Sequence, residues 1–174
     1  MKKFKYGFTL VELLVVMAII SILATVVVSG FRSSQMRGRD AARKSDLKQL
    51  SNSLELFYAD YGRYPAASGT EIAACPFDPL TKTGTACSFG ATGSRSEFTD
   101  GKTVYFKKLP KDPSSSQYYV YAVNSTYTKF QVFAKLENPE DKNIITGITK
   151  TCGTSLTCNY SVTSTNSTPT ESLQ

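Results

Sequence analysis

The chain has 174 residues and a formal charge of +6 at pH 7, which suits one domain with an appended segment. It contains no histidine, so neither a Ser-His-Asp nor a Cys-His catalytic arrangement can be built, and it has no glycine-rich phosphate loop and no H-E-x-x-H motif. Nothing singles out a pair of catalytic carboxylates either, and we therefore expect no enzyme activity and no cofactor.

The chain begins with a lysine-rich head that ends at Gly7. An apolar run over 8–31 follows, in which Glu12 is the only charged residue. As a helix this run is roughly 36 Å long, enough to cross the hydrocarbon core of a bilayer. It is too long for the apolar core of a secretory signal peptide, where a glutamate near the start is also out of place. A lone acid in a membrane segment indicates a functional site with a charged partner.

Helical periodicity continues over 32–62 but becomes one-sided, because apolar side chains recur every three or four residues and polar ones fill the other faces. We expect one helix from about Phe8 to about Ala59, which starts with a T-x-x-E capping box that includes Glu12 and ends near Gly62. The apolar positions of its second half are Leu47, Leu50, Leu54, Phe57, Tyr58 and Tyr61.

A cluster of basic residues follows the apolar run. We interpret it as a solvated helix face, with positive charge just inside a membrane, in preference to a DNA-binding surface. Three lysines before Gly7 supply half of the net charge of +6, so the basic balance is weak support for nucleic acid as a partner. The cluster consists of Arg32, Arg37, Arg39, Arg43, Lys44 and Lys48, with Asp40 and Asp46 among them.

Residues 66–102 are rich in glycine, serine, threonine and alanine, and we expect a long surface loop there. The loop contains Cys75 and Cys87, and Cys152 and Cys158 follow later in the chain. The spacings C-x11-C and C-x5-C, without histidine, argue against a zinc or redox site. An even number of cysteines in an exported chain indicates disulfides. Four cysteines allow three pairings, of which the nearest-neighbour pairing is the simplest.

Strand signals begin beyond this loop. The runs 117–123 and 129–136 are dense in tyrosine, valine and phenylalanine, and N-S-T-Y-T between them indicates a hairpin turn. The run 143–149 is expected to be a third strand, and the Ser/Thr-rich tail 161–174 is expected to be disordered. The fold class is therefore α+β, with a long N-terminal helix packed on a small antiparallel sheet and a globular head over 63–160.

The stretch KKFKYGFTLVELLVVMAIISILA resembles the N-terminus of type IV prepilins and the related pseudopilins. That family has a short basic leader ending in glycine, then F-T-L-V or a similar sequence, a glutamate and a long apolar helix. The resemblance implies that a prepilin peptidase removes the leader 1–7 and that the new amine of Phe8 is methylated. The matching residues are Gly7, Phe8, Thr9, Leu10 and Glu12.

The same resemblance implies that 8–31 anchors the subunit as a single pass in the bacterial inner membrane, in contact with lipid and with an assembly platform. The subunit then polymerises with copies of itself into a periplasmic type II secretion pseudopilus or an extracellular type IV pilus. In a stack of helices offset by about one turn, roughly 5 Å, Glu12 meets the Phe8 amine of a neighbour. Because such a pair relieves much of the cost of a charge in an apolar bundle, we expect Glu12 to be an assembly residue.

Two further stretches, YFKKLPKDP (105–113) and FYADYGRYP (57–65), resemble segments of major pseudopilins. Ser114 stands where those proteins usually carry tryptophan, and their calcium-holding ending, rich in glycine and aspartate, is not evident. These departures leave open the choice between pilus and pseudopilus. We read the nearby acidic cluster as a solvated turn and expect no metal. It consists of Glu137, Glu140 and Asp141.

Two alternative functions rank lower. One is a nucleic-acid-binding pilin for DNA uptake, which would need a basic stripe on the exposed side of the sheet. The other is a membrane-anchored carbohydrate-binding domain that uses the tyrosine-rich strand 117–123 as its platform. Both sets of side chains are more often solubility and packing residues. The candidates for the basic stripe are Lys102, Lys107, Lys108 and Lys111.

Overall fold

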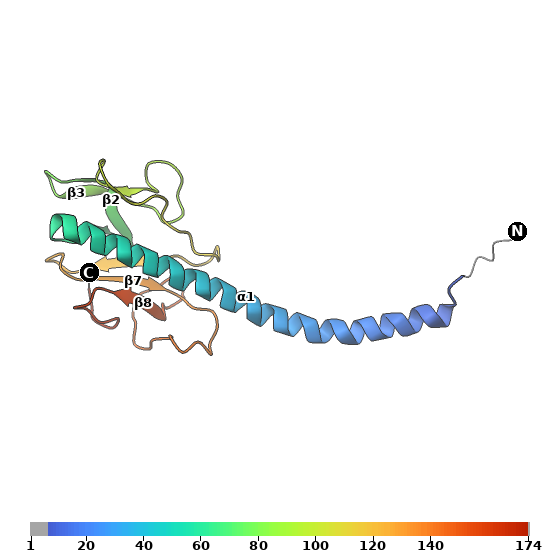
Figure 1. Cartoon of the computed structure of the whole chain (residues 1–174). Coiled ribbons are helices and arrows are strands. Elements are labelled where there is room, and N and C mark those ends of the chain that lie inside the picture. The colour runs from blue at the N-terminus through green and yellow to red at the C-terminus, as the bar shows by residue number, and fades with distance from the viewer. Residues whose placement is uncertain (1–6, 174) are drawn as a thin grey trace, which may run out of the picture. The chain divides into compact units, whose positions relative to one another are not determined.

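A computed structural model describes residues 7–173, apart from the side chains of residues 26–29 (Figure 1). Residues 1–6 of the expected leader and Gln174 lie outside the described residues. The chain forms two compact units, Met1–Gly38 and Arg39–Gln174. The helix α1 (Leu10–Tyr61) contributes residues to both units, and all the described strands belong to the second.

α1 is one continuous helix of 52 residues and begins and ends two residues later than predicted. Gly62 ends it with a backbone φ of +66°, a left-handed conformation that glycine adopts without steric cost. The Gly62 N–H donates to the Tyr58 carbonyl at 2.7 Å, which completes the last turn. The predicted extent of the helix is therefore confirmed to within two residues.

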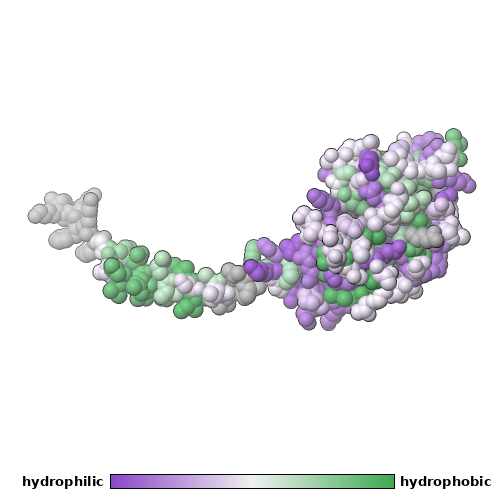
Figure 2. Space-filling view, turned by 180° about the vertical axis from the view of Figure 1, so that it is seen from behind, coloured by the Kyte–Doolittle hydropathy of each residue, from purple (hydrophilic) through white to green (hydrophobic). Residues whose placement is uncertain are grey.

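In the first unit, the described apolar side chains between Phe8 and Leu23 are all exposed. Figure 2 shows an apolar surface on the visible face of this part of the helix. Of the described residues, only α1 forms a helix that is long and apolar enough to cross a membrane. A helix that is apolar all round must be covered by lipid or by other helices, because water cannot solvate it favourably.

The second unit contains three small antiparallel sheets, with strand orders β1-β2-β3, β4-β5 and β6-β7-β8. In Figure 1 the second half of α1 crosses in front of them. The α+β class expected from the sequence is confirmed. The strands are β1 (Ala66–Ser68), β2 (Glu71–Asp78), β3 (Thr83–Ala86), β4 (Phe98–Thr99), β5 (Val104–Phe106), β6 (Val120–Val123), β7 (Phe130–Ala134) and β8 (Tyr160–Thr163).

The apolar face of α1 forms the centre of the core. Leu47, Leu50, Leu54 and Phe57 are completely buried, as the periodicity predicted. The Phe57 ring lies 4.9 Å from the Phe77 ring of β2 and meets it edge-on. Each fully buried side chain of this size stabilises the fold by about 1.5–3 kcal/mol.

The predicted hairpin is present as β6 and β7, although both strands are shorter than expected. Its turn is held by Asn124, whose Oδ1 accepts hydrogen bonds from the N–H groups of Thr128 at 2.8 Å and Lys129 at 2.9 Å. All five residues of β7 are buried, so both faces of this strand are covered. The Phe130 face packs toward α1, and the Phe133 face packs in a second cluster with Leu173.

The prediction of a surface loop over 66–102 is wrong, because β1, β2, β3 and β4 lie within this segment. Its small residues let strands approach closely. A Cβ at Gly84 would lie 2.3 Å from the carbonyl oxygen of Ala73, which glycine alone permits. Ile72 and Phe77 of β2 are buried in the core, so the segment is part of the folded unit.

Two expectations near the C-terminus are also wrong. The third strand of the sheet is β8 and not 143–149, which forms no strand. The tail 161–174 is not disordered over its described part, because β8 extends to Thr163 and Leu173 is only 5% exposed. The Gln131 amide donates to two carbonyl oxygens of this segment, which ties it to the outer face of β7. Contacts with one face of β7 thus order this polar segment.

Candidate functional site

The start of α1 is a reciprocal capping box made by Thr9 and Glu12. The Thr9 N–H and the Thr9 hydroxyl both donate to Glu12 Oε2 at 2.8 Å. In return, the Glu12 N–H donates to Thr9 Oγ1 at 3.3 Å. This confirms the T-x-x-E prediction and satisfies N–H groups that a helix start otherwise leaves without partners. The carboxylate also lies at the positive end of the helix dipole.

The residues just before the box are open to another protein. Phe8 is 86% exposed, and a Cβ placed on Gly7 would meet no heavy atom within 4 Å. Six residues of the leader lie outside the described part of the chain. Cleavage between Gly7 and Phe8, methylation of Phe8 and pairing of Glu12 with a neighbouring amine therefore stay predictions.

A buried ion-pair cluster lies on α1 in the second unit, and the sequence interpretation missed it. Arg43 is completely buried and donates to both oxygens of Asp112, at 2.8 Å each. It also donates to Asp40 at 2.8 Å and to Glu137 at 2.7 Å. Arg39 binds Glu137 from the next turn through Nε at 2.9 Å. The interpretation of this basic cluster as a solvated helix face is therefore wrong for Arg43.

The cluster fastens two distant loops to α1. Asp40 accepts the backbone N–H groups of Glu137 at 2.9 Å and Asn138 at 2.8 Å. Burial alone would lower the pKa of the Arg43 guanidinium, but its hydrogen bonds to Asp112 and Glu137 raise it above the ordinary value. The hydrogen bond from Arg39 likewise holds the pKa of Glu137 below its usual range. Arg43 and Glu137 are therefore charged at neutral pH.

One signal could have found the cluster. Asp40 and Arg43 extend the buried face of α1 by three- and four-residue steps back from Leu47. A charged pair on the apolar face of a helix is buried only when partners neutralise it. Those partners, Asp112 and Glu137, lie 69 and 94 residues away from Arg43 and could not be identified from spacing.

Most of the acidic residues considered for calcium form ion pairs with cationic side chains of α1. Glu137 pairs with two arginines, and Asp141 accepts a hydrogen bond from Lys44 Nζ at 2.6 Å. Glu140 is exposed. Between Gly7 and Leu173, no group of three or more His, Cys, Asp or Glu side chains is placed to hold a metal ion.

Both disulfides of the nearest-neighbour pairing are formed. Cys75 and Cys87 have Cα atoms 5.1 Å apart and join β2 to the end of β3. Cys152 and Cys158 have Cα atoms 5.2 Å apart and close a short loop before β8. All four cysteines are buried, so they act within the fold.

The residues of the two alternative functions have ordinary structural roles. Tyr119 and Tyr121 are each 1% exposed and donate hydrogen bonds to Asp46 at 2.7 Å and to the Pro65 carbonyl at 2.8 Å. They are core residues, and Tyr118, 41% exposed, is the one tyrosine of 117–123 that a sugar could reach. Of the lysines considered for nucleic acid, Lys107 pairs with Glu97 at 3.1 Å. All four candidates are exposed, namely Lys102, Lys107, Lys108 and Lys111.

Comparison with known proteins supports one family. Residues 2–28 match the family described as the prokaryotic N-terminal methylation motif. The type II secretion system core protein G of Aeromonas hydrophila is 35% identical over 117 residues, 67% of this chain and 73% of that protein. The core protein G of Pseudomonas aeruginosa is 32% identical over 113 residues, 64% of this chain and 70% of that protein.

A second kind of relative matches a shorter stretch. The type IV major pilin PilA of Myxococcus xanthus is 40% identical over 58 residues, 33% of this chain and 26% of that protein. No solved structure matches the chain. The N-terminal motif and the similarity to these relatives point to the same family. The chain therefore belongs to the family of type IV pilins and pseudopilins, whose members are structural subunits of pili and pseudopili.

Proposed function

We propose that this chain is a major subunit of a type II secretion pseudopilus, which acts structurally and catalyses no reaction of its own. It is inserted in the inner membrane as a single pass through the apolar part of α1. A prepilin peptidase then cuts between Gly7 and Phe8, and the new amine is methylated. An assembly platform in the inner membrane adds the mature chain to a filament of identical copies.

The observation that carries the proposal is the capping box at the end of an apolar helix. The Thr9 backbone N–H and the Thr9 hydroxyl both donate to the same oxygen of Glu12, Oε2. The second carboxylate oxygen remains for a donor from another molecule. After cleavage, the Phe8 amine of a neighbouring copy is a cation of the right kind, and pairing relieves the cost of both charges in apolar surroundings.

The comparisons favour a pseudopilus over a cell-surface pilus. The similarity to core proteins G extends over about two thirds of this chain and includes part of the globular unit. The similarity to the type IV pilin covers only 33% of the chain. DNA uptake and sugar binding gain no support, because two of the three tyrosines of 117–123 are buried and one lysine of the basic stripe is paired with a glutamate.

The test is to disrupt the outer membrane of cells that produce the full chain, to shear off the filaments and to sequence the N-terminus of the filament protein. We expect it to begin with methylated Phe8. A Glu12→Gln variant should be cleaved and retained in the membrane, but its yield of sheared filaments should fall at least tenfold. Glutamine keeps the carbonyl oxygen that the capping box needs, so the variant removes the charge alone. Normal filament yield from this variant would contradict the assembly role of Glu12.

A further inference from the structure

The turn between β2 and β3 presents an apolar side chain beside an anion. Leu80 is 91% exposed, more than any other large hydrophobic side chain described. Asp78 accepts the Leu80 N–H at 2.9 Å, and this hydrogen bond holds the pKa of the Asp78 carboxyl below its usual range. The disulfide Cys75–Cys87 cross-links the hairpin close to this turn and restricts the position of the turn. We call residues 78–82 the hairpin tip.

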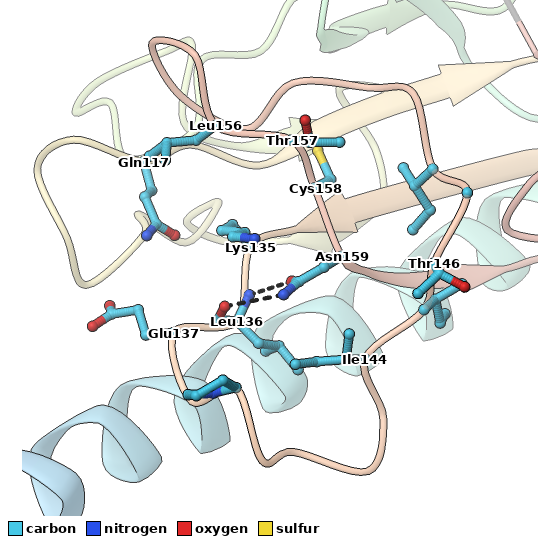
Figure 3. Close-up of a pocket in the computed structure, with 14 residues that line it drawn as sticks. Gln117, Lys135, Leu136, Glu137, Ile144, Thr146, Leu156, Thr157, Cys158 and Asn159 are labelled. Atoms are coloured by element: carbon cyan, nitrogen blue, oxygen red, sulfur yellow. Dashed lines mark hydrogen bonds between the residues drawn. The ribbon is translucent and has the colours of Figure 1, made fainter.

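A cavity of about 590 Å³ opens on another part of the same unit, within the size range of about 300–1000 Å³ for ligand pockets. Three loops and Gln117 line it, and Figure 3 shows their side chains. One loop is tied across the cavity by the Asn159 amide, which exchanges hydrogen bonds with the backbone of Leu136 at 2.6 and 3.1 Å. The apolar part of the lining consists of Leu136, Ile144, Ile145, Ile148 and Leu156.

Two polar groups at this cavity have no partner among the described residues. Gln117 Oε1 is buried and accepts no hydrogen bond there. In Figure 3 the Gln117 amide turns toward the side of the cavity where Lys135 and Glu137 lie. Lys135 makes no ion pair with any residue from 7 to 173, whereas Glu137 is neutralised by two arginines. The cavity thus combines an apolar wall with one cation and one buried acceptor.

The tip and the cavity lie at opposite ends of the second unit. The Phe77 ring, next to the tip, is 4.9 Å from the ring of Tyr61, the last residue of α1. At the cavity, the Glu137 N–H donates to Asp40 at 2.9 Å. From Asp40 to Tyr61 the helix rises by about 30 Å. A contact between such ends joins one copy to the next head to tail, and a rotation that does not close produces a helical filament.

We propose that the hairpin tip of one copy docks in this cavity of a second copy, as a head-to-tail contact between globular units in the filament. The inference rests on the structural role proposed above. Leu80 enters the apolar wall, and the Asp78 carboxylate approaches Lys135. The Thr81 hydroxyl and the Lys82 ammonium of the tip are donors for Gln117 Oε1. The match in charge and polarity selects a second copy as the occupant.

The test is a pair of cysteines placed across the contact in the full chain, Leu80→Cys together with Thr146→Cys. Thr146 is exposed at the edge of the cavity, so neither substitution disturbs the core. Filaments are sheared, oxidised and separated on a gel without reductant. We expect a ladder of covalent dimers, trimers and higher oligomers. Each single variant should give dimers at most, because one cysteine per copy cannot form a chain of links.

The matched control is Val104→Cys with Thr146→Cys, since Val104 is 47% exposed on a different strand. This pair should give no ladder. Normal filaments without a ladder from the Leu80 pair, or an equal ladder from the control pair, would overturn the docking proposal and leave the proposed function intact. If the unsubstituted chain forms no filaments, the proposed function itself fails.

A second variant tests the energetic role of the tip. Leu80→Asp should lower filament yield at least fivefold, because it places a second anion where the cavity offers an apolar wall. Val104→Asp should leave the yield within a factor of two. Thermal unfolding of both proteins should match that of the unsubstituted chain, since both positions are exposed. Equal filament yields from the two variants would contradict the proposal.

Discussion

Glu12 and Arg43 are charged residues on the same helix, but their surroundings in the two units of the chain are opposite. Glu12 lies among exposed apolar side chains, and its partners within the chain are the N–H and hydroxyl of its neighbour Thr9. Arg43 is buried and has three carboxylates of its own chain around it. The second unit therefore supplies the partners of its buried charge itself, whereas the cationic partner that we propose for Glu12 belongs to another molecule.

The apolar side chains differ in the same way. Those of the first unit are exposed, and those on the second half of α1 are buried against the sheets. Burial of apolar surface is the dominant stabilising term in folding, so the second unit has an internal source of stability. The first unit obtains the same term only when lipid or neighbouring helices cover it.

Removing the charge of Arg43 should destabilise the second unit by about 3–5 kcal/mol, because Asp112 and Asp40 would remain buried without a cation. The test is Arg43→Leu in the full chain in detergent. Its urea unfolding is followed by near-ultraviolet circular dichroism of tyrosine, since the chain has no tryptophan. The matched control, Arg39→Leu, should cost less than about 1 kcal/mol because that side chain is 34% exposed. Equal effects of the two variants would contradict the role given to burial.

The two disulfides should contribute unequally. Chain-entropy arguments give about 3 kcal/mol for Cys75–Cys87 and about 2 kcal/mol for Cys152–Cys158. The sequence separations are 12 and 6 residues, and the longer loop restricts the unfolded chain more. Replacing each pair by alanine and comparing urea unfolding measures the difference. A larger loss from the shorter loop would show that local packing, and not loop closure, decides the effect.

A smaller effect is expected from pH. Arg39 lowers the pKa of Glu137 in the folded state. The contribution of this ion pair to the free energy of unfolding is therefore present above the ordinary glutamate pKa, near 4.3. It is lost as the pH falls through the lower pKa of the folded state. The unsubstituted chain should therefore exceed Glu137→Gln in unfolding free energy by about 1 kcal/mol at pH 7, because solvent screens part of these pairs.

The difference should shrink when the pH falls below about 4, as Glu137 takes up a proton in both states. Urea unfolding of both proteins between pH 3 and pH 7 measures it. Glu140→Gln is a suitable control, because Glu140 is exposed and makes no ion pair with the described residues. A constant difference between the chain and Glu137→Gln at every pH would refute the assignment.

Signals that are local in sequence predicted the fold well. The extent of α1 follows from periodicity and from Gly62, and the β6-β7 hairpin follows from N-S-T-Y-T. The residues of the capping box are three apart, so their geometry could also be predicted. Interactions between distant segments could not. The close approach of Gly84 to Ala73, and the carboxylates around Arg43, depend on which segments meet in the folded chain.

The order of the tail has the same cause. Its serine- and threonine-rich composition is typical of disorder, yet Gln131 and the apolar cluster around Phe133 provide a surface that holds it. The composition of a segment indicates its own preference for order or disorder. It does not show which surfaces the rest of the chain presents to that segment. The alternation along β7 predicts one apolar face, which contains Phe130. Burial of the opposite face, which contains Phe133, could be predicted only from the segment that covers it.

The smallest expected effect concerns Thr9 and separates the two roles of Glu12. Thr9→Val removes the hydroxyl that donates to Glu12 and accepts from its N–H, while the Thr9 backbone N–H can still donate to Oε2. Loss of such a cap costs about 1 kcal/mol and frays the first turn of the helix. The charge of Glu12 remains available to a neighbouring copy.

Filament yield from Thr9→Val should therefore stay within a factor of two of the unsubstituted chain, whereas Glu12→Gln should lose filaments. Sheared filaments are measured against protein retained in the membrane for both variants. Glutamine can cap the helix but carries no charge, and valine removes the hydroxyl of the cap but leaves the charge. If both variants lose filaments equally, the start of α1 matters through its helical structure, and the partner of Glu12 would then lie within its own chain, as the partners of Arg43 do.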